Sequence, residues 1–201
     1  MKKNIITISR EYGSGGYEIG QRVAEALGFK FYDKDLLAKI AEHSMISVSF
    51  MEATEKKHLK RNLFTEIFPI FANSEVEQAN YIFSEQGRFI EKLAEEGNFV
   101  IAGRRADYYL RNHENAMHLF FYADMDFRID RICKKDNCTP DEAAKRIETM
   151  DKQRRTSYEY TTGRTWADRH NYDRMICTST YGIDKCVDEI IALMKMGMET
   201  K

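Results

Sequence analysis

The chain has 201 residues, of which 43% are apolar and 31% are charged, and its formal net charge is −1. These values predict a compact globular domain and exclude a disordered chain. The net charge near zero argues against a protein that binds nucleic acid polymers, because affinity for a phosphate backbone depends on accumulated basic charge.

The first 33 residues predict a strand, a glycine turn, a helix and a second strand. Residues 4–8 (NIITI) are short and β-branched, which is typical of a strand buried on both faces. A glycine-rich turn at residues 13–16 follows, and apolar residues then recur at helical spacing until Gly28, a plausible helix stop. Residues 29–32 predict the second strand, which ends at Asp33.

Residues 34–96 are rich in charged and helix-forming residues and predict several helices and no strand. Beyond them, short apolar runs predict three more strands, at 98–102, 117–123 and 174–178. One helix is expected from about residue 126, and another from Pro140 to about Arg155. Residues 156–172 read as a loop, and residues 183–196 as an amphipathic terminal helix.

Short apolar strands that alternate with helices predict an α/β fold with a five-stranded parallel sheet covered on both faces. Ligands in such sheets bind at the carboxyl ends of the strands. This rule directs attention to the segments at 9–16, 33, 103–105, 124 and 178–179.

The chain carries no pattern typical of a membrane or secreted protein. No segment reaches the roughly 18 apolar residues that a membrane span needs, and the first apolar run is too short for a signal sequence. The four cysteines show no paired spacing. We therefore expect a cytoplasmic protein with no membrane partner.

The glycine turn resembles a P-loop with altered side chains. A strand, a glycine turn and a helix present free backbone N–H groups and a positive helix end to an anion. Against the pattern G-x-x-x-x-G-K-[ST], Arg10 replaces the first glycine, Gly16 the lysine, and Tyr17 the Ser or Thr. Arg10 could supply the missing charge. The alternatives are a tight turn without a ligand, and an ion pair of Arg10 with Glu11 or Glu18.

Over nearly its whole length the sequence resembles the cytidylate kinase-like family, a divergent branch of the P-loop nucleoside monophosphate kinases. The resemblance rests on the order and spacing of six segments: ITISREYGSGG, FYDKDLL, VIAGRRADYYL, FFYADMDFRIDRI, IETMDKQRRTSYEYTTG and NYDRMICTSTYGID. It implies a single three-layer domain, a P-loop NTP hydrolase and NMP-kinase-like fold. The core would comprise residues 1–33, 97–135 and 173–201, with an acceptor-binding helical insertion at 34–96 and a lid at 136–172.

The resemblance also implies a reaction, in which ATP with Mg²⁺ donates its terminal phosphoryl group to a small nucleotide, CMP being the first candidate. The donor phosphates would lie on the loop residues Arg10, Gly13, Ser14, Gly15, Gly16 and Tyr17. The acceptor would lie by Asp33, Arg104 and Arg105. Arg105 replaces the aspartate of the GRD segment of cytidylate kinases, which puts selectivity for pyrimidines in doubt.

Phosphoryl transfer asks for positioned positive charge, because charge spreads over the transferred oxygens. Arg128 and Arg131 share one helical face, and Arg154 and Arg155 lie in the predicted lid. We expect these four arginines to neutralise the transferring group, with Asp151 orienting the lid arginines. The alternative is a solvated helical face with salt bridges along it.

The metal ligands cannot be identified from the sequence. Asp33 or Asp124 could position a metal, although either could equally cap a helix. Since the lysine and the metal-binding hydroxyl are both missing, two other functions stay open. The protein could be a nucleotide-binding regulator that has lost turnover, or a kinase of another small hydroxyl compound.

Overall fold

A computed structural model describes residues 3–33, 35–44, 49 and 73–199. In this part of the chain five parallel strands form one sheet in the order β2-β3-β1-β4-β5. The strands are β1 (Ile5–Arg10), β2 (Lys30–Tyr32), β3 (Phe99–Ala102), β4 (Ala116–Tyr122) and β5 (Arg174–Cys177). The predicted α/β class and five-stranded parallel sheet are confirmed.

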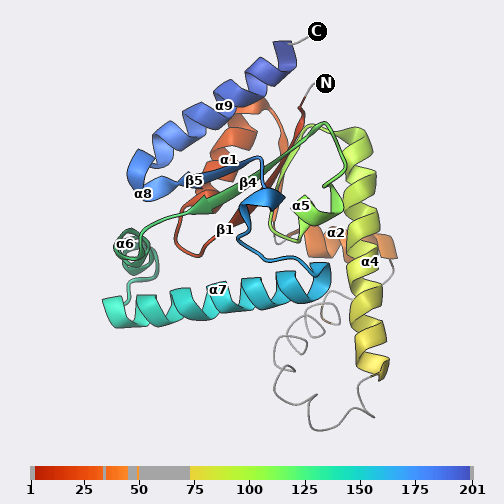
Figure 1. The fold of residues 1–201 in the computed structure, drawn as a ribbon, viewed down its shortest axis with the longest axis horizontal. Helices are drawn as coiled ribbons and strands as arrows, with labels where there is room; N and C mark the ends of the chain where they lie inside the picture. Colours follow the sequence, from red (N-terminus) through yellow and green to blue (C-terminus); the bar gives the residue numbers. More distant parts are fainter. Residues whose placement is uncertain (1–2, 34, 45–48, 50–72, 200–201) are drawn as a thin grey trace.

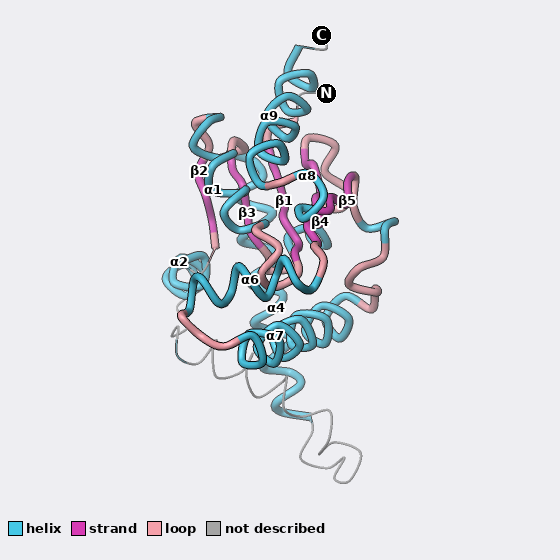
Figure 2. Tube along the Cα trace, turned by 90° about the vertical axis from the view of Figure 1, so that its left-hand side faces the viewer, coloured by secondary structure: helices cyan, strands magenta, loops and turns pink. Residues whose placement is uncertain are grey.

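Helices cover both faces of the sheet (Figures 1 and 2). Ile5 of β1 packs into a core with α2 (Asp35–Ser44), α4 (Asn73–Glu96) and α5 (Ala106–Tyr109). Ile6 and Ile8 point the other way, into a core with α1 (Gly16–Leu27) and α9 (Ile183–Glu199). Because successive side chains of a strand point to opposite faces, a central strand covered on both sides buries all of them, and the buried Thr7 hydroxyl between these isoleucines is paired with His118 at 2.8 Å.

Residues 34–96 include the helices α2 and α4, and no strand occurs among the described residues of this range. Residues 45–48 and 50–72 of the predicted acceptor insertion lie outside the described residues. No helix in the described ranges combines the length and the apolar character that a membrane crossing requires.

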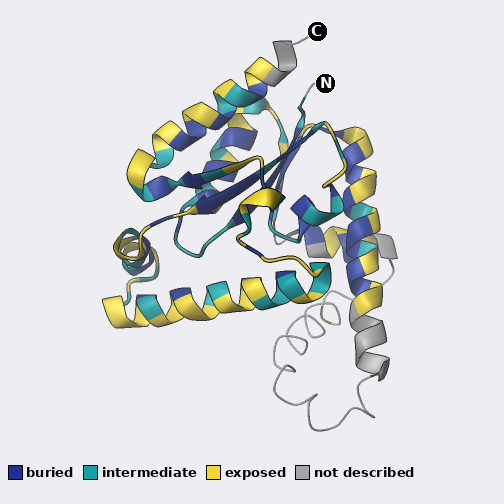
Figure 3. Ribbon diagram, in the orientation of Figure 1, coloured by how far each residue is buried: buried dark blue, intermediate teal, exposed yellow. Residues whose placement is uncertain are grey.

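Two helices lie across the carboxyl ends of the strands, α6 (Met125–Asp136) and α7 (Pro140–Thr162) (Figure 2). Pro140 opens α7 as predicted, and Thr139 and Glu142 form a capping box that fixes its start. Ile132 of α6 packs on Ala143 and Ile147 of α7. Much of α7 is otherwise exposed (Figure 3), so few apolar contacts hold it to the domain.

The prediction that α7 ends near residue 155 and that a loop follows directly is wrong, because the helix continues to Thr162. Tyr158 is buried in a cluster with Phe120 and Trp166, which stabilises the extra turns. Thr161 and Thr162 donate from their hydroxyls to carbonyls one turn back, so their polar groups are satisfied within the helix. The chain leaves the helix at Gly163 with φ of 66°. Tertiary packing here overrides the low helix propensity of Thr and Tyr.

A buried carboxylate joins the extra turns of α7 to the sheet. Asp107 of α5 is 4% exposed and accepts hydrogen bonds from the Tyr158 hydroxyl at 2.6 Å and from the Ser9 hydroxyl at 3.3 Å. Burial raises the pKa of Asp107 above its ordinary value, although both hydrogen bonds oppose the shift. The folded state therefore holds this proton to higher pH than the unfolded chain does.

This shift predicts a pH dependence of stability. The contribution of Asp107 is fully present below its ordinary pKa of about 4, and it declines as pH rises through the raised folded pKa. Asp107→Asn removes the titration and keeps an acceptor for Tyr158. Urea unfolding of the wild type and the variant, at a series of pH values from below pH 4 upwards, measures this dependence. We expect the free energy of unfolding of the wild type to fall relative to that of the variant as pH rises. Parallel pH curves would contradict the prediction.

Candidate active site

The glycine turn forms a backbone cradle at the carboxyl end of β1. Gly13 and Gly15 have φ of 84° and 87°, a left-handed conformation that glycine adopts without strain. Gly15 is the N-cap of α1. No described residue accepts a hydrogen bond from the amides of Gly13, Gly15, Gly16 or Tyr17. Several backbone donors therefore remain available at the positive end of a helix, an arrangement that suits an anion.

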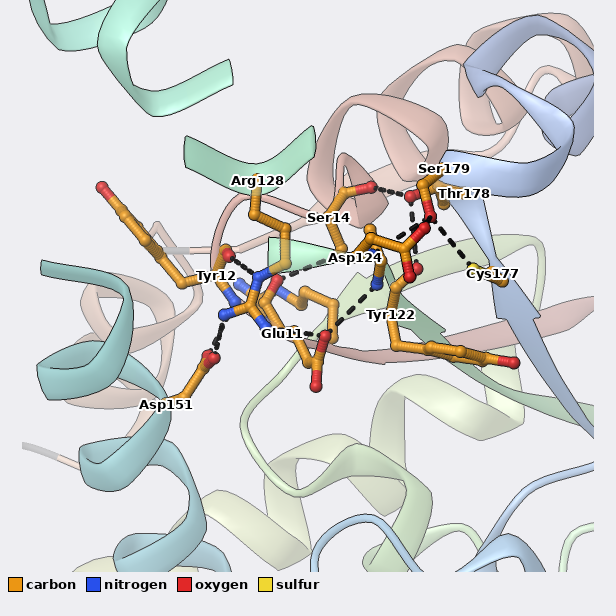
Figure 4. Close-up of polar contacts among 12 residues, drawn as sticks. Glu11, Tyr12, Ser14, Tyr122, Asp124, Arg128, Asp151, Cys177, Thr178 and Ser179 are labelled. Atoms are coloured by element: carbon orange, nitrogen blue, oxygen red, sulfur yellow. Dashed lines mark hydrogen bonds and ion pairs between the residues drawn. The ribbon is translucent and has the colours of Figure 1, made fainter. Parts of the chain in front are cut away.

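The cradle is braced from the sheet side (Figure 4). The buried Thr178 hydroxyl, at the start of α8 (Thr178–Tyr181), contacts the Ser14 carbonyl at 2.6 Å and the Tyr122 carbonyl at 3.2 Å. The Ser14 hydroxyl donates to the Glu11 carbonyl at 2.9 Å. Ser14 is fully buried, so its side chain supports the loop and does not line the cavity described next.

A cavity of about 830 Å³ opens over the cradle, within the size range of small-molecule sites. The glycine loop, Asp33, α6 and α7 enclose it. Its lining residues are Arg10, Glu11, Tyr12, Gly13, Gly15, Gly16, Tyr17, Glu18, Asp33, Arg131, Ile132, Lys134, Lys135, Met150 and Arg154. Five of them are basic and three are acidic, so the cavity carries a local excess of positive charge in a nearly neutral protein.

Arg10 is largely enclosed, with 16% of its side chain exposed. It forms an ion pair with Asp33 at 3.6 Å. The alternative ion pair with Glu11 or Glu18, considered from the sequence, does not form. Burial, followed by the charge of Arg154, lowers the pKa of Arg10 to about 9, so Arg10 still carries its charge at neutral pH. Burial also lowers the pKa of Arg154. Two desolvated guanidinium groups close together favour an anion between them.

Arg128 does not line this cavity. Its side chain is 6% exposed, and its three nitrogens all bind protein oxygens: Nε binds the Tyr12 carbonyl at 2.9 Å, Nη1 binds Glu11 at 2.8 Å, and Nη2 binds Asp151 (Figure 4). Asp151 also accepts a hydrogen bond of 2.7 Å from the Tyr12 amide. Arg128 thus joins α6, α7 and the glycine loop, which differs from the catalytic position expected for it.

The other predicted arginines and Asp151 do not all lie at the cavity. Arg131 lines the cavity and pairs with Glu18 at 2.7 Å. Arg154 lines the cavity and donates to the Arg10 carbonyl at 2.9 Å. Arg155 is exposed and lies outside the lining. Asp151 orients Arg128 and the Tyr12 amide, whereas the sequence predicts that it orients Arg154 and Arg155.

Arg104 and Arg105 follow β3 in a left-handed turn, each with φ of 57°. Arg104 is not among the residues that line the cavity, although its charge contributes to the lowered pKa of Arg10. Arg105 is buried, stacks over the Phe83 ring of α4 at 4.4 Å, and donates to Gln86 and to Ser157 of α7. Arg105 therefore connects α4 with α7.

The cavity lining holds three carboxylates, Glu11, Glu18 and Asp33, and carboxylate oxygens are ligands that Mg²⁺ prefers. Each of the three pairs with an arginine, and Glu11 is held by the buried Arg128. Within the described residues no group of three His, Cys, Asp or Glu side chains could hold a metal ion. The Asp124 carboxylate accepts a hydrogen bond from Ser179 and does not cap α6. These donors fit a magnesium ion carried mainly by substrate phosphates.

Four charged lining residues are not among the site residues that the sequence predicts: Glu11, Glu18, Lys134 and Lys135. Glu11 follows Arg10 directly in the same motif. A carboxylate next to a phosphate site is expected to repel the phosphate, and only the structure shows that Arg128 neutralises Glu11. Lys134 and Lys135 lie in the last turn of α6, where basic residues are common because they complement the helix dipole. Their position in the sequence therefore gives no separate signal that they line the cavity.

Comparisons with known proteins find relatives in sequence and in fold. The profile of the cytidylate kinase-like family matches residues 5–180. Cytidylate kinase of Pyrococcus horikoshii is 27% identical over 98% of this chain and 89% of its own length. The crystal structure of an uncharacterized protein from Eubacterium ventriosum is 25% identical, covers 96% of this chain and 99% of its own, and has a TM-score of 0.73. A gluconokinase from Sinorhizobium meliloti, 14% identical over 99% and 96% of the two chains, shares the fold with a TM-score of 0.53.

Proposed function

Because the chain belongs to the cytidylate kinase-like family, we propose that it transfers the terminal phosphoryl group of ATP to a nucleotide, CMP being the first candidate. One observation carries this proposal: unpaired loop amides and five basic side chains line the same cavity at the carboxyl ends of the strands. Amides and cations together are what a polyphosphate needs.

In this proposal the amides of Gly13, Gly15 and Gly16 bind the donor phosphates. Arg10 and Arg154 hold the transferred group between them, since both are desolvated and close together. Arg131, Lys134 and Lys135 of α6 add further positive charge to the cavity lining. Fixed positive charge of this kind stabilises the transition state because it needs no rearrangement during the transfer.

The acceptor would lie beside Asp33 and Arg104, with residues 34–96 as its insertion and 136–172 as the lid. The contact of α7 with the glycine loop through Asp151 and Arg154 supports a lid that excludes water. Mg²⁺, bound to the donor phosphates, would neutralise charge on their oxygens, and Glu18 and Asp33 are the carboxylates that could hold it.

The test is a coupled assay of ADP release with ATP, Mg²⁺ and a panel of nucleoside monophosphates together with gluconate. We expect turnover with a nucleoside monophosphate. A parallel thermal-shift series with ATP should show stabilisation of about 2.7 kcal/mol at 100 times the dissociation constant. A thermal shift without any turnover would support a regulator that only binds nucleotide. Turnover with gluconate alone would support a kinase of another small hydroxyl compound.

A further inference from the structure

Gly16 occupies the position at which a P-loop has its lysine. The backbone conformation at this position does not require a glycine. Gly13 and Gly15 need glycine because their φ values are positive. Gly16 is the first residue of α1 and is not among the residues with positive φ. A helical residue with ordinary dihedrals accepts any side chain for which there is space. The cause must therefore be the surroundings of Gly16.

Those surroundings leave no room for a side chain. A Cβ atom at Gly16 would lie 2.9 Å from the Cβ of Arg10 and 3.0 Å from Cβ and Cδ2 of Phe121. Arg10 and Phe121 are paired in register on the neighbouring strands β1 and β4. The Cβ atoms of two central strands cannot move aside by rotation about a side-chain bond. A lysine at position 16 is thus excluded by any residue with a Cβ atom at position 10, arginine included, and Phe121 adds to the crowding.

The rest of the Arg10 side chain relies on a second glycine. A Cβ atom at Gly103 would lie 2.4 Å from Nη1 of Arg10. The guanidinium group therefore lies in space that Gly103 leaves free, next to Asp33 and within the fields of Arg104 and Arg154. Arg10 also lines the cavity above the cradle. Its charge consequently lies between the loop and the predicted acceptor residues.

We propose that Arg10 and Gly16 form one coupled exchange, in which Arg10 carries at the end of β1 the charge that a lysine carries at the start of the helix in an ordinary P-loop. This inference rests on the proposed function, because it assigns Arg10 to the outer phosphates of a nucleoside triphosphate. A guanidinium presents its donors in a rigid, planar fork that matches two phosphate oxygens, whereas a lysine ammonium is a compact charge on a flexible stem. Replacing the lysine thus moves the cation without removing it.

The steric exclusion between positions 10 and 16 is tested by measuring the Tm of variants without any ligand. Gly16→Ala is made in the wild type, in Arg10→Ala, which keeps the Cβ atom, and in Arg10→Gly, which removes it. We expect Gly16→Ala to lower the Tm by about 2 to 10 °C in the first two proteins and by clearly less in the third, where only Phe121 remains close. An equal loss in all three proteins would overturn the steric exchange.

The charge half is tested by titration with ATP. Arg10→Ala should weaken ATP binding about 10- to 100-fold, the loss expected for a hydrogen bond to a charged group. The double variant Arg10→Gly with Gly16→Lys should bind ATP more tightly than Arg10→Gly alone. Lys152→Ala, which removes an exposed cation from α7, is the control and should bind as the wild type does.

The outcomes separate the two proposals. If the wild type binds ATP and Arg10→Ala binds it equally well, the role of Arg10 is overturned while the proposed function stands. If the wild type does not bind ATP, the proposed function and the charge role of Arg10 both fail. The Tm series decides the steric exclusion in either case, since it needs no ligand.

Discussion

Arg154→Ala is expected to lower kcat/KM for phosphoryl transfer by at least about 10³-fold, the loss typical of an arginine that contacts the transferred phosphoryl group. Arg154 lines the cavity beside Arg10, and burial lowers its pKa, so its charge is poorly solvated in the free protein. A poorly solvated cation gains most from a developing anion. Steady-state kinetics with the best acceptor from the panel measures the effect.

Two comparisons make this result specific. Arg154→Lys keeps the charge but loses the paired donors, so it should recover only part of the activity. Lys152→Ala removes an exposed cation two residues away and should change kcat/KM by about twofold or less, since surface substitutions usually cost less than about 0.5 kcal/mol. Equal losses in Arg154→Ala and Lys152→Ala would show that only the overall charge of α7 matters.

Arg128→Met is expected to reduce the free energy of unfolding by about 3 to 5 kcal/mol, the cost of leaving a buried charge without its partner. Glu11 and Asp151 both bind Arg128, and the Tyr12 carbonyl accepts its Nε. Removing the guanidinium brings two carboxylates together without a cation. Urea unfolding monitored by circular dichroism measures the loss at pH 7.

Arg146→Met is the matched control. Arg146 also joins α7 to α6, through Asp136 at 3.0 Å, but its side chain is 47% exposed. Exposed ion pairs contribute about 0 to 1 kcal/mol, so this variant should be nearly as stable as the wild type. If Arg128→Met lost no more stability than Arg146→Met, the view of Arg128 as a residue that positions α7 on the glycine loop would have to be abandoned.

The two arginine pairs illustrate how far the sequence could predict the site. Arg128 and Arg131 are three residues apart on one helix, and spacing alone gave them one role. In the structure Arg131 faces the cavity, while Arg128 faces Glu11 and Asp151. Likewise Arg154 lines the cavity and its neighbour Arg155 is exposed. Helical periodicity groups side chains by face, but it does not say which element covers each face.

Local patterns in the sequence determined the parallel sheet, the glycine cradle and the capped start of α7. The reason is that an uninterrupted β-branched run, a glycine turn and a Thr-Pro cap each act within a few residues of the chain. Only the tertiary structure decided that Arg10 pairs with Asp33, that Tyr158 extends α7, and that Arg128 becomes a brace. These contacts join residues as distant as 117 positions apart, and their energies depend on burial, which exists only once the elements have packed.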